Sequence, residues 1–257
     1  MAEVNPAARE AFSQASAAYV TGRPGYPGEI DGWLKERVGI GPGSVVADLG
    51  AGTGKFTARL LGSGARVIAL EPVDGMRDKL RETCPMAQAL GANAAEIPLA
   101  DESLDGIFCA QSFHWFATGD TLAEFRRVLK PGCALGLIWN MRDVTVDWVA
   151  ALDRIMDPFE RATPRFHEGQ WRLCFPAEGF APLIEEIFTH HHEGSFETVV
   201  VKRILSVSFI AALPDDRREE VARQVRQLAG TSPDLADPDH VRFPYKTLVA
   251  WTKKLPA

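Results

Sequence analysis

An acid followed by three alternating glycines is the stretch of this sequence best suited to hold a ligand. Asp48 ends a short apolar run. Glycines follow it at every second position: Gly50, Gly52 and Gly54. Glycine allows the unusual φ angles of a sharp turn and leaves no Cβ between the backbone and a ligand. Apolar residues at helical spacing come next, so the stretch predicts the strand, turn and helix that bind nucleotides in open α/β sheets.

The spacing of these glycines does not fit the two common phosphate-binding loops. A dinucleotide fingerprint, G-x-G-x-x-G, starting at Gly50 would need its third glycine at the position of Lys55. A phosphate loop, G-x-x-x-x-G-K-[ST], would need glycine in place of Leu49 and a hydroxyl in place of Phe56. With both phosphate loops excluded, the motif present in the sequence is an acid followed by G-x-G-x-G.

A second acid, Glu71, stands at the end of the next predicted strand, 23 residues after Asp48. In Rossmann-like folds an acid about 20 residues beyond the glycine loop accepts hydrogen bonds from ribose hydroxyls. A carboxylate offers several acceptor sites to two adjacent hydroxyls, and it repels a 2′-phosphate. We therefore predict that Glu71 binds a ribose; the alternative is a solvent-exposed acid at a strand end.

The elements that must position these residues alternate between strand and helix patterns. Strand patterns cover 45–48, 66–70, 88–92, 106–110, 134–139, 186–191 and 245–251. Helical patterns cover 30–38, 55–62, 72–80, 118–130, 148–156, 199–209 and 213–230. Strands that alternate with helices indicate an α/β fold with a mostly parallel sheet.

The composition limits the domain count and the classes of partner. The chain has 257 residues, of which 46% are hydrophobic and 24% charged, so we expect a single domain over 1–257. Its net charge of −6 argues against broad electrostatic binding of nucleic acid. No apolar run approaches the length of a membrane span, and the four cysteines form no C-x-x-C pair. We predict a soluble, cytoplasmic protein and leave its oligomeric state open.

Taken in order, these motifs resemble the class I S-adenosylmethionine-dependent methyltransferases, in particular the type 11 group. The acid with G-x-G-x-G carries the resemblance, together with the run Gln111-Ser112-Phe113-His114-Trp115-Phe116 after the fourth strand. The resemblance implies a Rossmann-like seven-stranded sheet with helices on both faces. It also implies S-adenosyl-L-methionine as cofactor, converted to S-adenosyl-L-homocysteine. The cofactor core would span 40–141, and segments within about 142–240 would form a helical lid over the fourth and fifth strands.

The same resemblance implies roles for four further residues. Met76 would lie against the adenine ring, although a thioether is equally suited to the core. At Asn93-Ala94 the family usually has Asp-Ala, with the acid and the next backbone amide contacting adenine. Asn93 departs from that pattern, but its amide oxygen can still accept a hydrogen bond; the alternative is an ordinary turn asparagine. Gln111 would contribute backbone contacts to the methionine end.

Residues 19–27 form a proline-stiffened run, Y-x-x-x-R-P-x-Y-P. In related methyltransferases such a leader folds over the cofactor. Arg23 would then meet the methionine carboxylate, and Tyr19 would lie near the sulfonium. The alternative is a surface arm that packs its aromatic rings on the core.

Histidines are the candidate catalytic and metal-binding groups. His114 is the best candidate for a general base, because it would lie near the transferred methyl and titrates near neutrality. Alternatively its ring packs on Trp115. The run His190–His192 is not expected to bind metal, since alternate strand residues face opposite ways and no partner motif exists.

The expected acceptor is a small apolar or aromatic molecule, with the methylated atom (O, N or C) left open. Aromatic and apolar residues are abundant around the predicted mouth: Phe113, Trp115, Phe116, Trp139, Met141 and Trp171. Met141 and Trp171 suit the core equally well. The sequence lacks the motifs of base-amino methyltransferases and a basic stripe with stacking aromatics. Two rivals remain, a non-catalytic cofactor-binding or interaction protein and an NAD-type oxidoreductase.

Overall fold

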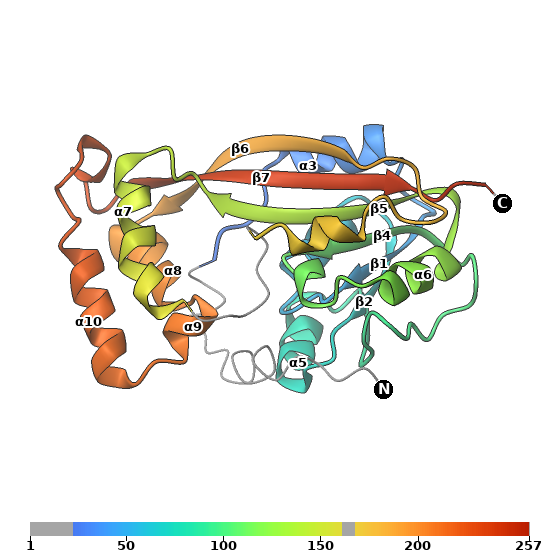
Figure 1. Cartoon of the computed structure of the whole chain (residues 1–257), viewed down its shortest axis with the longest axis horizontal. Helices are drawn as coiled ribbons and strands as arrows, with labels where there is room; N and C mark the ends of the chain where they lie inside the picture. The colour runs from blue at the N-terminus through green and yellow to red at the C-terminus, as the bar shows by residue number, and fades with distance from the viewer. Residues whose placement is uncertain (1–22, 161–167, 257) are drawn as a thin grey trace.

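The computed structural model describes residues 23–160 and 168–256, and its framework is one seven-stranded sheet (Figure 1). The strand order is β3-β2-β1-β4-β5-β7-β6. All neighbouring strands pair in parallel except β7, which is antiparallel to both β5 and β6. The strands are β1 (Val45–Leu49), β2 (Arg66–Leu70), β3 (Gln88–Leu90), β4 (Leu104–Ala110), β5 (Leu129–Arg142), β6 (Ile184–Gly194) and β7 (Val241–Lys253). The predicted Rossmann-like, mostly parallel sheet is confirmed.

The order of the strands places a crevice next to β1. The chain runs outward from β1 through β2 to β3, then returns to the other side of β1 with β4. In open α/β sheets ligands bind at such a reversal, beyond the carboxyl ends of the strands. The predicted glycine turn follows β1 and the predicted ribose acid follows β2, so both lie at this edge.

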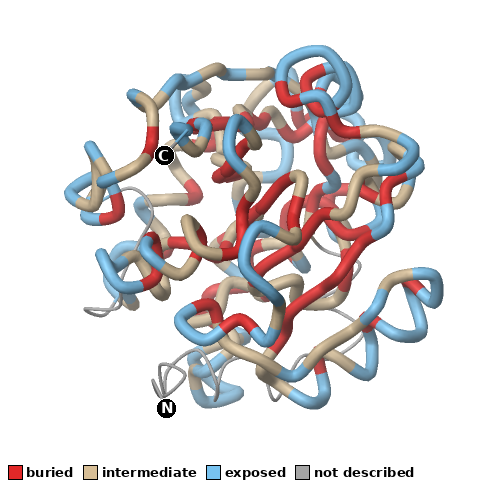
Figure 2. The backbone as a smooth tube through the Cα atoms, turned by 90° about the vertical axis from the view of Figure 1, so that its right-hand side faces the viewer, coloured by how far each residue is buried: buried red, intermediate tan, exposed pale blue. Residues whose placement is uncertain are grey.

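Helices cover both faces of the sheet. Val46 of β1 packs with one apolar cluster that includes residues of α4, whereas Ala47 and Leu49 pack with the cluster that includes Phe125 of α6. This alternation follows from the period of two in a strand, and Figure 2 shows the buried residues following the central strands. The helices of this part are α3 (Glu29–Gly32), the π-helical turn η1 (Trp33–Arg37), α4 (Lys55–Gly62), α5 (Asp74–Thr83) and α6 (Gly119–Val128).

The segments after β5 form a second apolar cluster, which includes Phe243 and Tyr245 of β7. In Figure 1 these helices lie at one end of the molecule, beyond the arrowhead of β5. They are α7 (Asp147–Met156), η5 (Glu197–Val201), α8 (Lys202–Leu205), α9 (Ser208–Ala211) and α10 (Asp215–Arg226). Short 3-10 turns complete the described chain: η2 (Phe113–Trp115), η3 (Asp157–Phe159), η4 (Gln170–Cys174) and η6 (Pro233–Leu235). The action of these helices as a lid stays a prediction.

Two elements differ from the sequence expectation. The fifth strand begins at Leu129, which pairs with Leu104, so the helix predicted to reach 130 ends at Val128. The helix predicted over 199–209 is three short pieces, and its first piece holds the β-branched run Val199–Val201. β-branched side chains lose rotamer freedom in a helix, which weakens a continuous one. Among the described helices none is both long and apolar enough to cross a bilayer.

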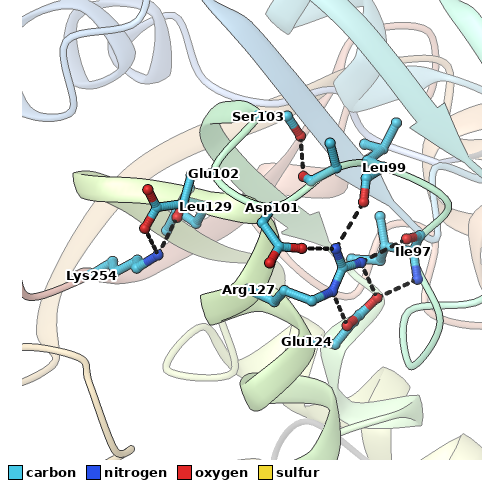
Figure 3. Close-up of polar contacts among 10 residues, drawn as sticks. Ile97, Leu99, Asp101, Glu102, Ser103, Glu124, Arg127, Leu129 and Lys254 are labelled. Atoms are coloured by element: carbon cyan, nitrogen blue, oxygen red, sulfur yellow. Dashed lines mark hydrogen bonds and ion pairs between the residues drawn. The ribbon is translucent and has the colours of Figure 1, made fainter. Parts of the chain in front are cut away.

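Arg127 of α6 fastens the segment that follows β3 (Figure 3). Its guanidinium donates to both Glu124 carboxylate oxygens at 2.8 and 2.7 Å and to Asp101 at 2.7 Å. It also donates to the carbonyl oxygens of Ile97 and Leu99, each at 2.9 Å. The carboxylates of Glu124 and Asp101 raise the pKa of Arg127. Arg127 therefore holds the loop 97–101 against α6. Its position near the end of a helix by itself indicates only a favourable interaction with the helix dipole.

We expect Arg127→Met to lower the free energy of unfolding by about 2 kcal/mol, because two backbone carbonyls and two carboxylates lose their donor. Arg126→Met is the matched control on the same helix. Arg126 forms an exposed ion pair with Glu178, so its loss should cost less than about 1 kcal/mol. Urea unfolding of both variants measures the difference; equal costs would contradict the role of Arg127.

Candidate active site

A cleft opens at the carboxyl ends of β1, β2 and β4, where the strand order reverses. Most of the residues predicted to bind the cofactor line it: Arg23, Asp48, Gly50, Gly52, Glu71, Met76, Asn93, Ala94 and Gln111. Tyr19 lies outside the described residues. The strand ends bring these residues together although they are spread over 89 positions of the sequence.

The glycines of the turn serve different purposes. A Cβ on Gly52 would meet no atom within 4 Å, so the absent side chain leaves open space in the cleft. A Cβ on Gly50 would lie 2.7 Å from the Cβ of Ser112, which packs directly on the turn. Both glycines have positive φ. Gly54 does not line the cleft, since its missing Cβ would meet Leu80 at 2.7 Å on the opposite side.

Glu71 fixes the glycine turn from β2. One carboxylate oxygen accepts from the Gly52 amide at 2.9 Å and the other from the Val73 amide at 2.9 Å. Burial raises the pKa of Glu71, and the two backbone donors oppose that shift. Each oxygen keeps a further lone pair for a ligand hydroxyl, so a ribose contact is compatible with these bonds.

Asp48 is the most buried acid of the cleft, with 1% of its surface exposed. Its Oδ2 accepts from the Thr57 hydroxyl at 2.6 Å. Its Oδ1 is buried and has no hydrogen-bond partner in the described chain. Burial raises the pKa of Asp48 to about 7, with a smaller contribution from Glu71. A buried carboxylate oxygen without a donor is costly, and the ammonium group at the amino-acid end of the cofactor would satisfy it.

The predicted adenine side combines an apolar wall with a polar turn. Met76 is 3% exposed and Ala94 is 7% exposed, and both line the cleft. The Asn93 Oδ1 accepts from the Ala95 amide at 2.9 Å, which is the local turn contact of an ordinary turn asparagine. One lone pair of that oxygen remains for a ligand donor.

Gln111 has a positive φ of 61°, which is uncommon for a residue other than glycine. Its amide donates to the Ile138 carbonyl at 2.8 Å, and its side chain donates to the Asn140 carbonyl at 3.3 Å. The next residue, Ser112, donates to the Leu49 carbonyl at 2.6 Å. These bonds turn the chain across the cleft after β4 and hold its backbone against the end of β1.

Three basic side chains gather on the other side of the cleft: Arg23, Lys55 and Arg203. Lys55 donates to the Arg23 carbonyl, and Arg23 donates to the Ser206 carbonyl at 3.1 Å. Burial lowers the pKa of Lys55 to about 8, with help from both arginines. Sequence reasoning missed Lys55 and Arg203. The position of Lys55 directly after the glycine turn could have indicated its place in the cleft. Arg203 belongs to α8, which is distant in sequence, so no local pattern indicates its place.

The aromatic residues expected at the mouth divide into two groups. Trp115 and Phe116 line the cleft. Phe113, Trp139 and Trp171 are at most 1% exposed and belong to the main apolar cluster. The predicted place at the mouth is therefore wrong for Phe113 and Trp139, whereas Trp171 takes the core position that was its alternative. Met141 also packs against that cluster. Large aromatics bury more apolar area than any other residues, which favours the core unless another element leaves space open.

His114 is held beside Trp139, whose indole Nε1 donates to its Nδ1 at 3.2 Å. Its ring also packs against that of Trp115, with centroids 5.1 Å apart and the ring planes tilted by 38°. The bond from Trp139 places the imidazole proton on Nε2 in the neutral form. The role of His114 as a general base stays a prediction.

In β6, His190 and His192 are partly buried and His191 is exposed, as alternation predicts. The described residues contain no cluster of three metal ligands.

Comparison with known proteins agrees with this geometry. Residues 47–137 match the family model of the methyltransferase domain. An uncharacterized methyltransferase-like protein of Schizosaccharomyces pombe is 36% identical over 247 residues, 96% of each chain. The solved structure of a candidate type II methyltransferase from Anaeromyxobacter dehalogenans is 23% identical and superposes with a TM-score of 0.69. That match covers 91% of this chain and 99% of the other.

A more distant structure shares the fold. A Haemonchus contortus phosphoethanolamine N-methyltransferase, solved with S-adenosylhomocysteine, is 14% identical and superposes with a TM-score of 0.51 over 89% of this chain and 53% of its own. The sequence relationship to the fission-yeast protein shows that this chain belongs to the methyltransferase family. It is an S-adenosylmethionine-dependent methyltransferase. The open side of Gly52 and the unpartnered Asp48 Oδ1 fit that cofactor.

Proposed function

We propose that the enzyme methylates a small molecule with an apolar or aromatic body by in-line displacement. The observation that carries this proposal is the pair Trp115 and Phe116, which line the cleft directly after the Gln111 turn. Aromatic walls beside a few placed polar groups are typical of small-molecule sites.

The residues of the chain have separate tasks in this proposal. Glu71 binds the ribose, while Met76, Asn93 and Ala94 flank the adenine. Asp48 and the backbone at Gln111 orient the amino-acid end. When bound, S-adenosylmethionine supplies an electrophilic methyl group on a sulfonium centre.

The chain itself supplies position. Trp115 and Phe116 exclude water and hold the acceptor in line behind the methyl group. Positioning of this kind can contribute about 7–11 kcal/mol to lowering the barrier. A general base adds ~10²–10⁴-fold for a protonated nucleophile. If His114 removes the proton, its Nδ1 must first lose the hydrogen bond from the Trp139 indole.

The test is an acceptor screen that measures S-adenosylhomocysteine release over matched phenols, amines and acids, with and without aromatic rings. We expect turnover with apolar or aromatic acceptors and none with oligonucleotides. Tight cofactor binding without turnover on any acceptor would favour the non-catalytic rival. Stabilisation by NADH alone in a thermal-shift assay would contradict the cofactor assignment.

A further inference from the structure

Two guanidinium groups and one ammonium group are concentrated at the rim of the cleft around Ser206, which is 5% exposed. The Ser206 carbonyl accepts from Arg23 at 3.1 Å, and its hydroxyl oxygen lies 3.5 Å from an Nη1 of Arg203. The Nε of Arg203 donates to the Tyr245 hydroxyl at 3.2 Å, which fixes the guanidinium at the cleft. Lys55 is tied to the same group through the Arg23 carbonyl. Lys55 and Arg203 are thus held near Arg23 by neutral groups of the described residues.

Neither Lys55 nor Arg203 forms an ion pair with a carboxylate of the described residues. This distinguishes them from most basic side chains of the protein, which pair with acids on the surface. Holding cations near one another in a partly desolvated site is unfavourable unless an anion joins them. The arrangement is therefore prepared for a negatively charged ligand.

The cofactor alone does not balance this charge. S-adenosylmethionine carries a carboxylate, an ammonium and a sulfonium, so it brings a net positive charge. The charged side chains that line the described cleft are three cations, Arg23, Lys55 and Arg203, and two acids, Asp48 and Glu71. With both acids ionised and the cofactor bound, two positive charges remain in excess. Arg23 is assigned to the cofactor carboxylate, which leaves Lys55 and Arg203 for another anion.

We propose that the methyl acceptor carries a carboxylate and that Lys55 and Arg203 bind it. The inference rests on the proposed function and narrows its substrate class to a small acid with an apolar or aromatic body. Arg203 offers a planar fork that matches a carboxylate, and Lys55 adds a point charge from the first turn of α4. Trp115 and Phe116 line the same cleft and would contact the body of the acid.

The experiment uses three probes with one ring and different head groups: benzoate, benzamide and phenyl phosphate. Isothermal titration first measures S-adenosylhomocysteine binding to the wild type, Lys55→Met and Arg203→Met. Each cofactor-saturated protein is then titrated with the three probes. Lys202→Met is the matched control, because Lys202 is an exposed neighbour of Arg203 outside the cleft.

We expect benzoate to bind the wild type at least about tenfold more tightly than benzamide, since a charged partner strengthens each hydrogen bond. Lys55→Met and Arg203→Met should each remove most of that preference, and Arg203→Met should change S-adenosylhomocysteine affinity by less than about threefold. Lys202→Met should behave as the wild type.

Three outcomes would overturn the proposal while leaving the methyltransferase assignment intact. The first is equal or absent binding of benzoate and benzamide. The second is a clear preference for phenyl phosphate. The third is a loss that falls on S-adenosylhomocysteine and not on benzoate, which would assign the cations to the cofactor. Absence of S-adenosylhomocysteine binding to the wild type would instead refute the proposed function, and it is seen before any probe is added.

Discussion

Replacing Glu71 with alanine should weaken S-adenosylhomocysteine binding by at least about tenfold, the effect of losing hydrogen bonds to a charged group. Two losses combine in this variant. The proposed ribose hydroxyls lose their acceptor, and the Gly52 amide loses the carboxylate oxygen that holds it at 2.9 Å. The glycine turn is then free to move away from the position that the cofactor needs.

Isothermal titration measures this effect, and Asp74→Ala is the control. Asp74 is a nearby acid whose side chain is 84% exposed and pairs only with Arg77 among the described residues. Its removal should leave cofactor affinity within about twofold of the wild type, as expected for an exposed ion pair. Unchanged affinity in Glu71→Ala would remove that residue from the ribose site. Thermal unfolding of the ligand-free variant checks separately whether the loss of the acceptor for the Gly52 and Val73 amides has disturbed the fold.

Asp48→Asn should affect binding and stability in opposite directions. The asparagine side chain still offers an oxygen that accepts from the Thr57 hydroxyl. It carries no negative charge where Oδ1 lacks a partner among the described residues. We expect S-adenosylhomocysteine affinity at pH 8 to fall at least about tenfold. We expect the ligand-free variant to be more stable than the wild type at pH 8 by about 1 kcal/mol or more, or roughly 2–4 °C in Tm.

The sign follows from the pKa of Asp48. Folding raises it from 3.8 to about 7, so the folded state binds the proton more tightly than the unfolded state. That stabilising contribution is present below pH 3.8 and is lost as the pH rises through 7. At pH 8 the buried carboxylate is ionised, and its Oδ1 has no hydrogen-bond partner among residues 23–160 and 168–256. Asparagine removes the cost of that buried charge.

Cofactor binding should show the complementary pH dependence. The ammonium of the cofactor favours ionised Asp48, so wild-type affinity should fall by up to about tenfold between pH 8 and pH 6. The Asp48→Asn variant should lack this decrease. Titrations at three pH values test the prediction, and a flat wild-type profile would show that Asp48 does not meet the cationic end of the cofactor.

Local patterns of the sequence determined the cofactor half of the molecule. The run ending at Asp48, the glycines and Glu71 predicted a strand, a turn and a second strand end; β2 has the predicted bounds, and β1 extends one residue beyond Asp48. The prediction worked because turn geometry and side-chain alternation depend on neighbouring residues. Because short connections place consecutive parallel strands next to each other, the carboxyl ends of β1 and β2 lie at the same edge of the sheet.

Only the tertiary structure decided which aromatic and basic residues face the cleft. Phe113 and Trp115 stand two positions apart in one short segment, yet one is buried in the core and the other lines the cleft. Arg203 joins Lys55 across 148 positions of sequence because α8 packs beyond the ends of the strands. The hydrophobicity or charge of such a residue is compatible both with the cleft and with another part of the fold. The choice depends on packing between distant segments, which local periodicity does not encode.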